Sequence, residues 1–252
     1  MWKGLVGSIR YGLLKDKMRV PRPGTDSPAY GSDGRGTTPW LPPLRNPSHS
    51  PDEAFAAFLA DAIRDRAEWI RFNDAELTVL PATLGGLGSL RILELKKNAF
   101  EAVPESIGDL SRLETIALPG NQLAVIPPTI GRLKRLMVLG LSSNKLRSLP
   151  EQIGEAIGLR ELHLGGNQLE SVPESIGCLK DLIKLNLNNN ALRTLPRSLL
   201  KCTNLRYLYL HDNPQLSIPG NILGPPAGEV FKGSAQAMEP RTILTWYFTH
   251  KA

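Results

Sequence analysis

The chain has 252 residues, of which 41% are hydrophobic, so it can bury a core and a fully disordered protein is excluded. Its 30 Lys and Arg residues against 24 acidic residues give a net charge of +6, which raises the question of nucleic acid or an acidic membrane as a partner. Residues 1–50 carry eight bases and three acids, which leaves a nearly neutral remainder of 22 bases against 21 acids. Two cysteines, no Asn-x-Ser/Thr acceptor with x other than Pro, and no long apolar segment favour a soluble cytoplasmic protein.

The first 50 residues divide into two parts of different composition. Residues 20–50 hold seven prolines and four glycines, which predicts a disordered linker. Residues 1–19 carry five apolar side chains on one side of a helical wheel: Trp2, Leu5, Val6, Ile9 and Leu13. This pattern is typical of an interfacial helix, but isolated helices of this length are marginal in water. We therefore favour a basic tail without a membrane role and keep membrane contact as the alternative.

A helix is predicted over residues 51–66. Ser50-Pro51-Asp52-Glu53 matches a capping box with proline at the first helical position. Apolar residues then recur at helical spacing, at Ala54, Phe55, Phe58, Leu59 and Ile63. We expect this helix to cover the start of the segment that follows it.

Residues 67–223 repeat with a period of 23 residues. The unit reads L-x-x-L-x-L-x-x-N-x-L-x-x-L-P-x-x-I-G-x-L-x-x, and an imperfect first copy has Ala75 where the later copies have asparagine. The asparagine recurs at Asn98, Asn121, Asn144, Asn167, Asn190 and Asn213. Leucines and a proline keep the same period, which predicts a solenoid whose repeats cover one another's apolar faces.

Each part of the unit predicts a structural role. The L-x-L portion is a short strand with both leucines pointing inward, and stacked copies make a parallel sheet. The asparagine turns the chain and offers an amide to buried backbone groups, so we interpret the asparagine ladder as structural. In the return segment, proline prevents another strand and glycine permits a tight bend.

A second cap is predicted over residues 224–252. The register loosens after Asn213, and we expect a loop from Gly224 to Met238. Pro240 then opens a short apolar helix with Ile243, Leu244, Trp246, Tyr247 and Phe248. The expected fold class is α/β, a horseshoe-shaped solenoid with a parallel concave β-sheet and helical caps.

The unit resembles the intracellular leucine-rich repeats of the Ras-associated class, including the plant Ras-group proteins, which carry the same L-P-x-x-I-G. Over residues 51–250 the flanks are also similar to those of bacterial Roco repeat arrays. The matching segments are 69–81, 213–219, 222–225 and 242–248. In Roco proteins a GTPase domain follows this segment. Because the sequence ends at Ala252 without a Gly-x-x-x-x-Gly-Lys-Ser/Thr motif, we do not expect GTPase activity from it.

Candidate catalytic and metal-binding residues are few. Cys202 takes a buried leucine position of the repeat and Cys178 a convex turn, so neither is expected to act as a nucleophile. His163 and His211 lie on outward positions of different strands, without a second histidine at ligand spacing. The sequence therefore predicts no enzyme activity, no metal and no cofactor.

The outward positions of the strands carry the functional signal, because the other positions build the frame. The row between the strand leucines reads Arg71, Glu94, Ala117, Gly140, His163, Asn186 and Tyr209. The row before it reads Trp69, Ile92, Thr115, Val138, Glu161, Lys184 and Tyr207. The middle is small and smooth, whereas the C-terminal end is aromatic and polar, which favours a protein contact over nucleic acid, since nucleic acid needs a face lined with Lys and Arg.

We therefore predict a non-catalytic interaction module, a scaffold in signalling, that binds a protein or peptide on its concave face. The predicted contact residues are Glu94, Lys96, Glu161, His163, Lys184, Asn186, Asn188, Tyr207, Tyr209 and His211. The two tyrosine side chains are expected to be exposed together at the end of this face. The competing reading is a face that is merely solvated.

Two further functions stay open. The chain could be a detached repeat subunit that works with a Roco- or Ras-like GTPase in trans, in which case its C-terminal segment would be exposed for docking. It could also be a secreted bacterial effector with residues 1–50 as an export tail.

Overall fold

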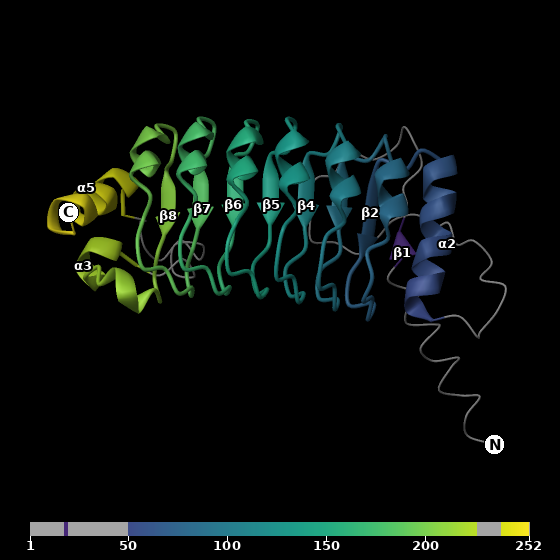
Figure 1. Ribbon diagram of the computed structural model, residues 1–252, viewed down its shortest axis with the longest axis horizontal. Coiled ribbons are helices and arrows are strands. Elements are labelled where there is room, and N and C mark those ends of the chain that lie inside the picture. Colours follow the sequence, from purple (N-terminus) through teal and green to yellow (C-terminus); the bar gives the residue numbers. More distant parts are fainter. Residues whose placement is uncertain (1–17, 20–49, 226–237, 252) are drawn as a thin grey trace, which may run out of the picture.

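The computed structural model describes residues 18–19, 50–225 and 238–251 (Figure 1). Figure 1 shows a row of strands in chain order, with one α-helix at the N-terminal end and two at the C-terminal end. This architecture confirms the predicted α/β solenoid. The predicted linker and interfacial helix of the first 50 residues lie outside the described residues, apart from Met18, Arg19 and Ser50.

The sheet has eight strands in sequence order. Seven of them pair in parallel: β2 (Trp69–Phe72), β3 (Ile92–Glu94), β4 (Thr115–Ala117), β5 (Val138–Gly140), β6 (Glu161–His163), β7 (Lys184–Asn186) and β8 (Tyr207–Tyr209). β1 (Met18–Arg19) pairs antiparallel with β2. The register joins residues 23 positions apart, as in the pair Leu139 and Leu162, so every repeat position forms a straight row across the sheet.

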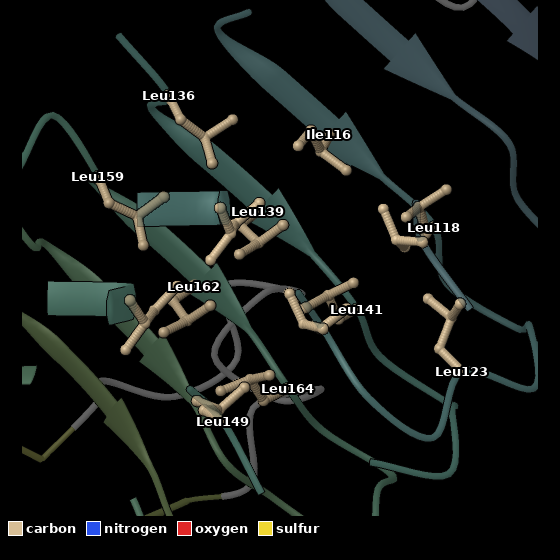
Figure 2. Packing of buried hydrophobic residues seen from close by; sticks show 14 of the residues in the cluster. Ile116, Leu118, Leu123, Leu136, Leu139, Leu141, Leu149, Leu159, Leu162 and Leu164 are labelled. Carbon is tan, nitrogen blue, oxygen red and sulfur yellow. The ribbon is translucent and has the colours of Figure 1, made fainter. Parts of the chain in front are cut away.

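Apolar side chains of successive repeats pack directly on one another. Figure 2 shows this stacking for β4, β5 and β6, where Leu118, Leu141 and Leu164 follow one another along the solenoid. The latter two are fully buried and Leu118 is nearly so. A single repeat could not bury these leucines, so each one is stabilised by contacts to the repeats before and after it.

The asparagine ladder has the structural role predicted for it. Asn144 accepts a hydrogen bond at Oδ1 from the Leu123 amide (3.1 Å) and donates from Nδ2 to the carbonyls of Leu118 (3.0 Å) and Leu141 (2.9 Å). The six ladder asparagines are all buried. One side chain therefore satisfies buried backbone groups of two repeats, which leucine could not do.

The residue before each of the six asparagines, and before Ala75 in the first copy, adopts the left-handed conformation, a feature that the repeat formula leaves as x. The positions are Asp74, Lys97, Gly120, Ser143, Gly166, Asn189 and Asp212, with φ between 52° and 72°. This conformation is costly for most residues. It recurs because the chain turns inward at this position, and that turn requires a positive φ.

The return segment of each repeat forms a short 3₁₀ helix. These are η1 (Ala82–Gly86), η2 (Glu105–Asp109), η3 (Pro128–Arg132), η4 (Glu151–Glu155), η5 (Glu174–Cys178) and η6 (Arg197–Lys201), followed by η7 (Pro214–Leu216). Gly131 and Gly154 lie outside the left-handed region, so a positive φ is not the reason for glycine at these positions. A Cβ on Gly154 would stand 2.3 Å from the Ser175 carbonyl oxygen, so glycine is needed for close packing of adjacent repeats.

Helix α2 (Pro51–Arg64) covers the first repeat, within the predicted range 51–66. The capping box is present, with the Ser50 amide donating to Glu53 Oε2 (2.7 Å) and the Glu53 amide donating to Ser50 Oγ (3.3 Å). Phe55 and Phe58 meet Phe72 edge to face, at ring distances of 4.9 and 4.7 Å. These contacts shield the open apolar end of the first repeat from water.

Two helices, α3 (Gly220–Leu223) and α5 (Pro240–His250), lie at the other end (Figure 1). The sequence predicted α5 but not the short α3. On α5, Ile243, Leu244 and Tyr247 are buried, and the Leu195 amide donates to the Tyr247 hydroxyl oxygen (3.3 Å). Residues 226–237, within the predicted loop, lie outside the described residues.

Candidate partner-binding surface

The predicted contact residues fall into two groups on the outward face of the sheet. Glu94 and Lys96 lie at β3, near the N-terminal end. The C-terminal patch consists of Glu161, His163, Lys184, Asn186, Asn188 and Tyr207, on and next to β6, β7 and β8. Strands β4 and β5 separate the two groups, so the structure does not bring all predicted residues together.

The charged residues of each group are paired with one another. Glu94 Oε2 lies 2.6 Å from Arg71 Nε and 3.7 Å from Lys96 Nζ, so one carboxylate faces two cations. In the C-terminal patch, Glu161 Oε2 lies 2.9 Å from His163 Nε2 and 3.8 Å from Lys184 Nζ. These side chains are mostly half-buried, and ion pairs at a protein surface contribute about 0–1 kcal/mol to stability.

Asn186 and Asn188 combine surface exposure with a structural role that the sequence did not reveal. Asn186 Oδ1 accepts the Asn188 amide (3.0 Å), and Asn188 Oδ1 accepts the His211 amide (2.8 Å). Both side chains are half-buried. Their oxygens hold the end of the strand, so only the Nδ2 groups are left to donate to a partner.

Two predicted contact residues are covered, which corrects the expectation of an exposed tyrosine pair. Tyr207 is 39% exposed, whereas Tyr209 is only 3% exposed. Burial, and secondarily the nearby Tyr207, raises the pKa of the Tyr209 phenol. His211 is half-buried and its Nε2 atom is sealed from solvent. Repeat geometry points these positions outward, but after β8 the chain leaves the register and packs back against this end of the solenoid.

The middle of the face is uncharged and nearly flat. At β4 and β5 the outward positions hold Thr115, Ala117, Val138 and Gly140. A Cβ built on Gly140 would meet its nearest atom, the Ile116 carbonyl oxygen, at 3.6 Å, an ordinary contact. The fold therefore does not require glycine here. Glycine inside a strand often marks a place where another chain approaches closely.

A row of residues that the sequence analysis passed over lies one position before the strands. Along the solenoid it reads Glu68, Arg91, Glu114, Met137, Arg160, Ile183 and Arg206. Arg91 forms a two-bond pair with Glu114 (2.9 and 3.0 Å), but Arg160 and Arg206 flank an isoleucine. Reading this position at the repeat period would have shown two arginines without an acidic neighbour in their row.

The cysteines and histidines do not form a reactive centre in the described part of the chain. Cys202 is buried and donates from Sγ to the Ile176 carbonyl (3.4 Å), and burial raises the pKa of its thiol. Cys178 is exposed on the convex side, in η5. Across the described residues, no three His, Cys, Asp or Glu side chains gather as metal ligands would. No helix among them combines the length and apolar character needed to cross a bilayer.

Two family models match the sequence. The model described as "Leucine-rich repeat region" matches residues 79–164, and the one described as "Leucine rich repeat" matches residues 157–214. Together they span more than half of the chain. No curated protein matches it.

Solved structures that are similar to the chain include the following three. A leucine-rich repeat protein of Leptospira interrogans is 34% identical, with a TM-score of 0.47 over 56% of this chain and 42% of its own. The PEPR1–AtPEP1 structure is 34% identical, with a TM-score of 0.56 over 60% of this chain and 22% of its own. An internalin of Listeria monocytogenes is 23% identical, with a TM-score of 0.45 over 52% and 38%. The chain thus spans less than half the length of each.

Proposed function

The chain belongs to the leucine-rich repeat proteins, and from that premise we propose that it is a non-catalytic scaffold that binds a protein or peptide on its concave sheet face. One observation carries this proposal. The leucines and asparagines that recur in every repeat are buried, whereas the strand positions between the leucines vary and lie in register on the outward face of one sheet. These variable side chains therefore share one rigid surface.

The chemistry of this face supports a protein partner. Its C-terminal patch combines the exposed Tyr207 with the ion pairs of Glu161, and aromatic residues among polar ones are typical of contact surfaces. The two strand rows, together with the row two positions after the one between the strand leucines, carry the cations Arg71, Lys96 and Lys184 against Glu94 and Glu161; this last row holds Lys96, Pro119, Ser142, Gly165, Asn188 and His211. That mixture does not provide the cation-lined face that nucleic-acid backbones need. The likeness to PEPR1–AtPEP1, a repeat structure named with a second molecule, is consistent with a peptide partner.

The packing of the C-terminal helix favours this proposal over a detached subunit that docks a GTPase through its C-terminal segment. Such docking would leave α5 exposed, but Ile243, Leu244 and Tyr247 of that helix are buried against the last repeats. The alternative of an exported effector depends on residues 1–50, which lie almost entirely outside the described residues.

The test compares partner capture by the parent chain and by a His163→Ala/Tyr207→Ala variant. Both residues lie on the outward face, so the variant should fold normally and lose the partners that mass spectrometry identifies with the parent. Leu200→Ala is the matched control, because Leu200 is also 39% exposed but lies in η6, away from the sheet. Partners retained equally by all three proteins would show that the concave face is not the binding surface.

A further inference from the structure

A small hollow lies beside the C-terminal patch, at the N-terminal ends of strands β6, β7 and β8. Arg160, Asp181, Ile183, Asn204 and Arg206 line it, and its volume is about 170 Å³. Sites for small-molecule ligands usually measure roughly 300–1,000 Å³. The hollow is therefore suited to one side chain of a larger partner and not to a cofactor.

The backbone holds the two arginines at fixed positions. The Ile183 amide donates to the Arg160 carbonyl, and the Arg206 amide donates to the Ile183 carbonyl, each at 2.8 Å. Neighbouring strands lie about 4.8 Å apart, so the Cα atoms of Arg160 and Arg206 are separated by about 10 Å. Both guanidinium groups can therefore reach the same bound group from opposite sides.

Neither arginine has its charge neutralised within the described part of the chain. No carboxylate there lies within ion-pair distance of Arg160 or Arg206, in contrast to Arg91, which is paired with Glu114. Two guanidinium groups around one hollow favour an anion that can accept hydrogen bonds from both.

The remaining lining residues narrow the choice of anion. Asp181 contributes a carboxylate to the same hollow, which opposes a doubly charged phosphate more strongly than a singly charged carboxylate. Ile183 offers an apolar floor, and Asn204, whose Nδ2 donates to the Lys180 carbonyl (2.9 Å), keeps Oδ1 as an acceptor. The lining therefore suits an acidic side chain on a peptide whose backbone amide can donate to Asn204.

We propose that this hollow binds an aspartate or glutamate side chain of the partner peptide, and that it is the part of the surface that selects acidic sequences. The inference rests on the proposed function, because Arg160, Ile183 and Arg206 directly precede the first residues of β6, β7 and β8, on which the C-terminal patch lies. In this arrangement the peptide extends from Tyr207 past the N-terminal ends of the strands, and its acidic residue lies between Arg160 and Arg206.

The test begins with peptides selected on the parent protein from a random display library. Selected sequences are synthesised with acetylated and amidated ends, so that side chains supply the only carboxylates. We expect them to contain Asp or Glu beside an apolar residue. Replacing that acid with its amide, or using the Arg160→Gln/Arg206→Gln protein, should each weaken binding about tenfold. Both changes together should weaken it no further, because they remove the same contact.

The control protein is Arg147→Gln/Arg241→Gln, which makes the same change in net charge at exposed positions away from the hollow. Its affinity should equal that of the parent. Equal weakening by this control, or selected peptides without acidic residues, would overturn the assignment. Tighter binding of a peptide with phosphoserine in place of the acid would replace the carboxylate with phosphate as the preferred anion.

The same library separates this inference from the proposed function. Some selected peptides could bind the Arg160→Gln/Arg206→Gln protein but fail to bind the His163→Ala/Tyr207→Ala protein. That result would leave the concave face as the binding surface and overturn the role of the hollow. If no selected peptide depends on either variant, both proposals are wrong.

Discussion

Leu141 shows how a single residue of the repeat stabilises its neighbours. It is fully buried, and its side chain lies between Leu118 and Leu164 of the adjacent repeats (Figure 2). We expect Leu141→Ala to reduce the free energy of unfolding by about 2–5 kcal/mol, because the neighbouring leucines cannot collapse into the cavity. Urea denaturation measures this loss. Ile157→Ala, at a residue 57% exposed, is the control and should change stability by less than about 0.5 kcal/mol.

The two tyrosines of β8 should respond differently to truncation. Tyr209→Ala should reduce the free energy of unfolding by about 2–5 kcal/mol, because the ring is buried. Tyr207→Ala should leave it within about 0.5 kcal/mol of the parent. Thermal and urea unfolding of both variants measure these changes. Similar losses for the two would mean that their environments do not differ.

The stability that Tyr209 provides should also depend on pH. Because its folded-state pKa is raised by burial, the contribution is present below the ordinary value of about 10 and is lost as the pH rises through the folded-state value. The difference in stability between the parent and Tyr209→Phe should therefore change above that pH. An unchanged difference across this range would contradict the burial of the phenol.

At the scale of the element, the 3₁₀ helices limit which side chains the convex face accepts. Gly154→Ala places a methyl group 2.3 Å from the Ser175 carbonyl oxygen, so η4 and η5 must separate. Overpacking of this kind costs about 1–3 kcal/mol. Gly88→Ala makes the same chemical change where nothing lies within 4 Å, and it should be neutral or slightly stabilising. Equal urea midpoints for the two variants would show that the stack tolerates the methyl group.

At the scale of the whole molecule, the caps decide whether the solenoid unfolds as one unit. Trp69 lies at the first repeat and Trp246 on the C-terminal cap, so variants in which one of them is the single tryptophan left of the four report by fluorescence on opposite ends. When no cap residue is changed, the fluorescence of either tryptophan should give the same midpoint of urea unfolding.

Weakening the N-terminal cap should separate those two midpoints. Phe58→Ala removes a fully packed ring from α2 and should cost about 3–5 kcal/mol at that end. Because repeats interact only with neighbours, the Trp69 midpoint should fall further than the Trp246 midpoint. An equal fall at both ends would mean that the repeats are coupled along their entire length.

The sequence alone determined the solenoid, because a 23-residue period places every leucine and asparagine in the same environment in each copy. It also determined which positions face outward on the sheet. Both caps could be anticipated from the capping box at Ser50 and the apolar run after Pro240, since an open repeat end must be covered.

Only the tertiary structure decided what happens where the period ends or where adjacent repeats meet. Tyr209 is buried although the repeat places it at an outward position, and a periodic formula alone does not predict that burial. Gly154 proved to be a packing position, because the nearest atom to its missing Cβ belongs to the next repeat. The repeat period places Arg160 and Arg206 in one row, 46 residues apart in sequence, but only the structure shows that they share one hollow with Asp181 and Asn204.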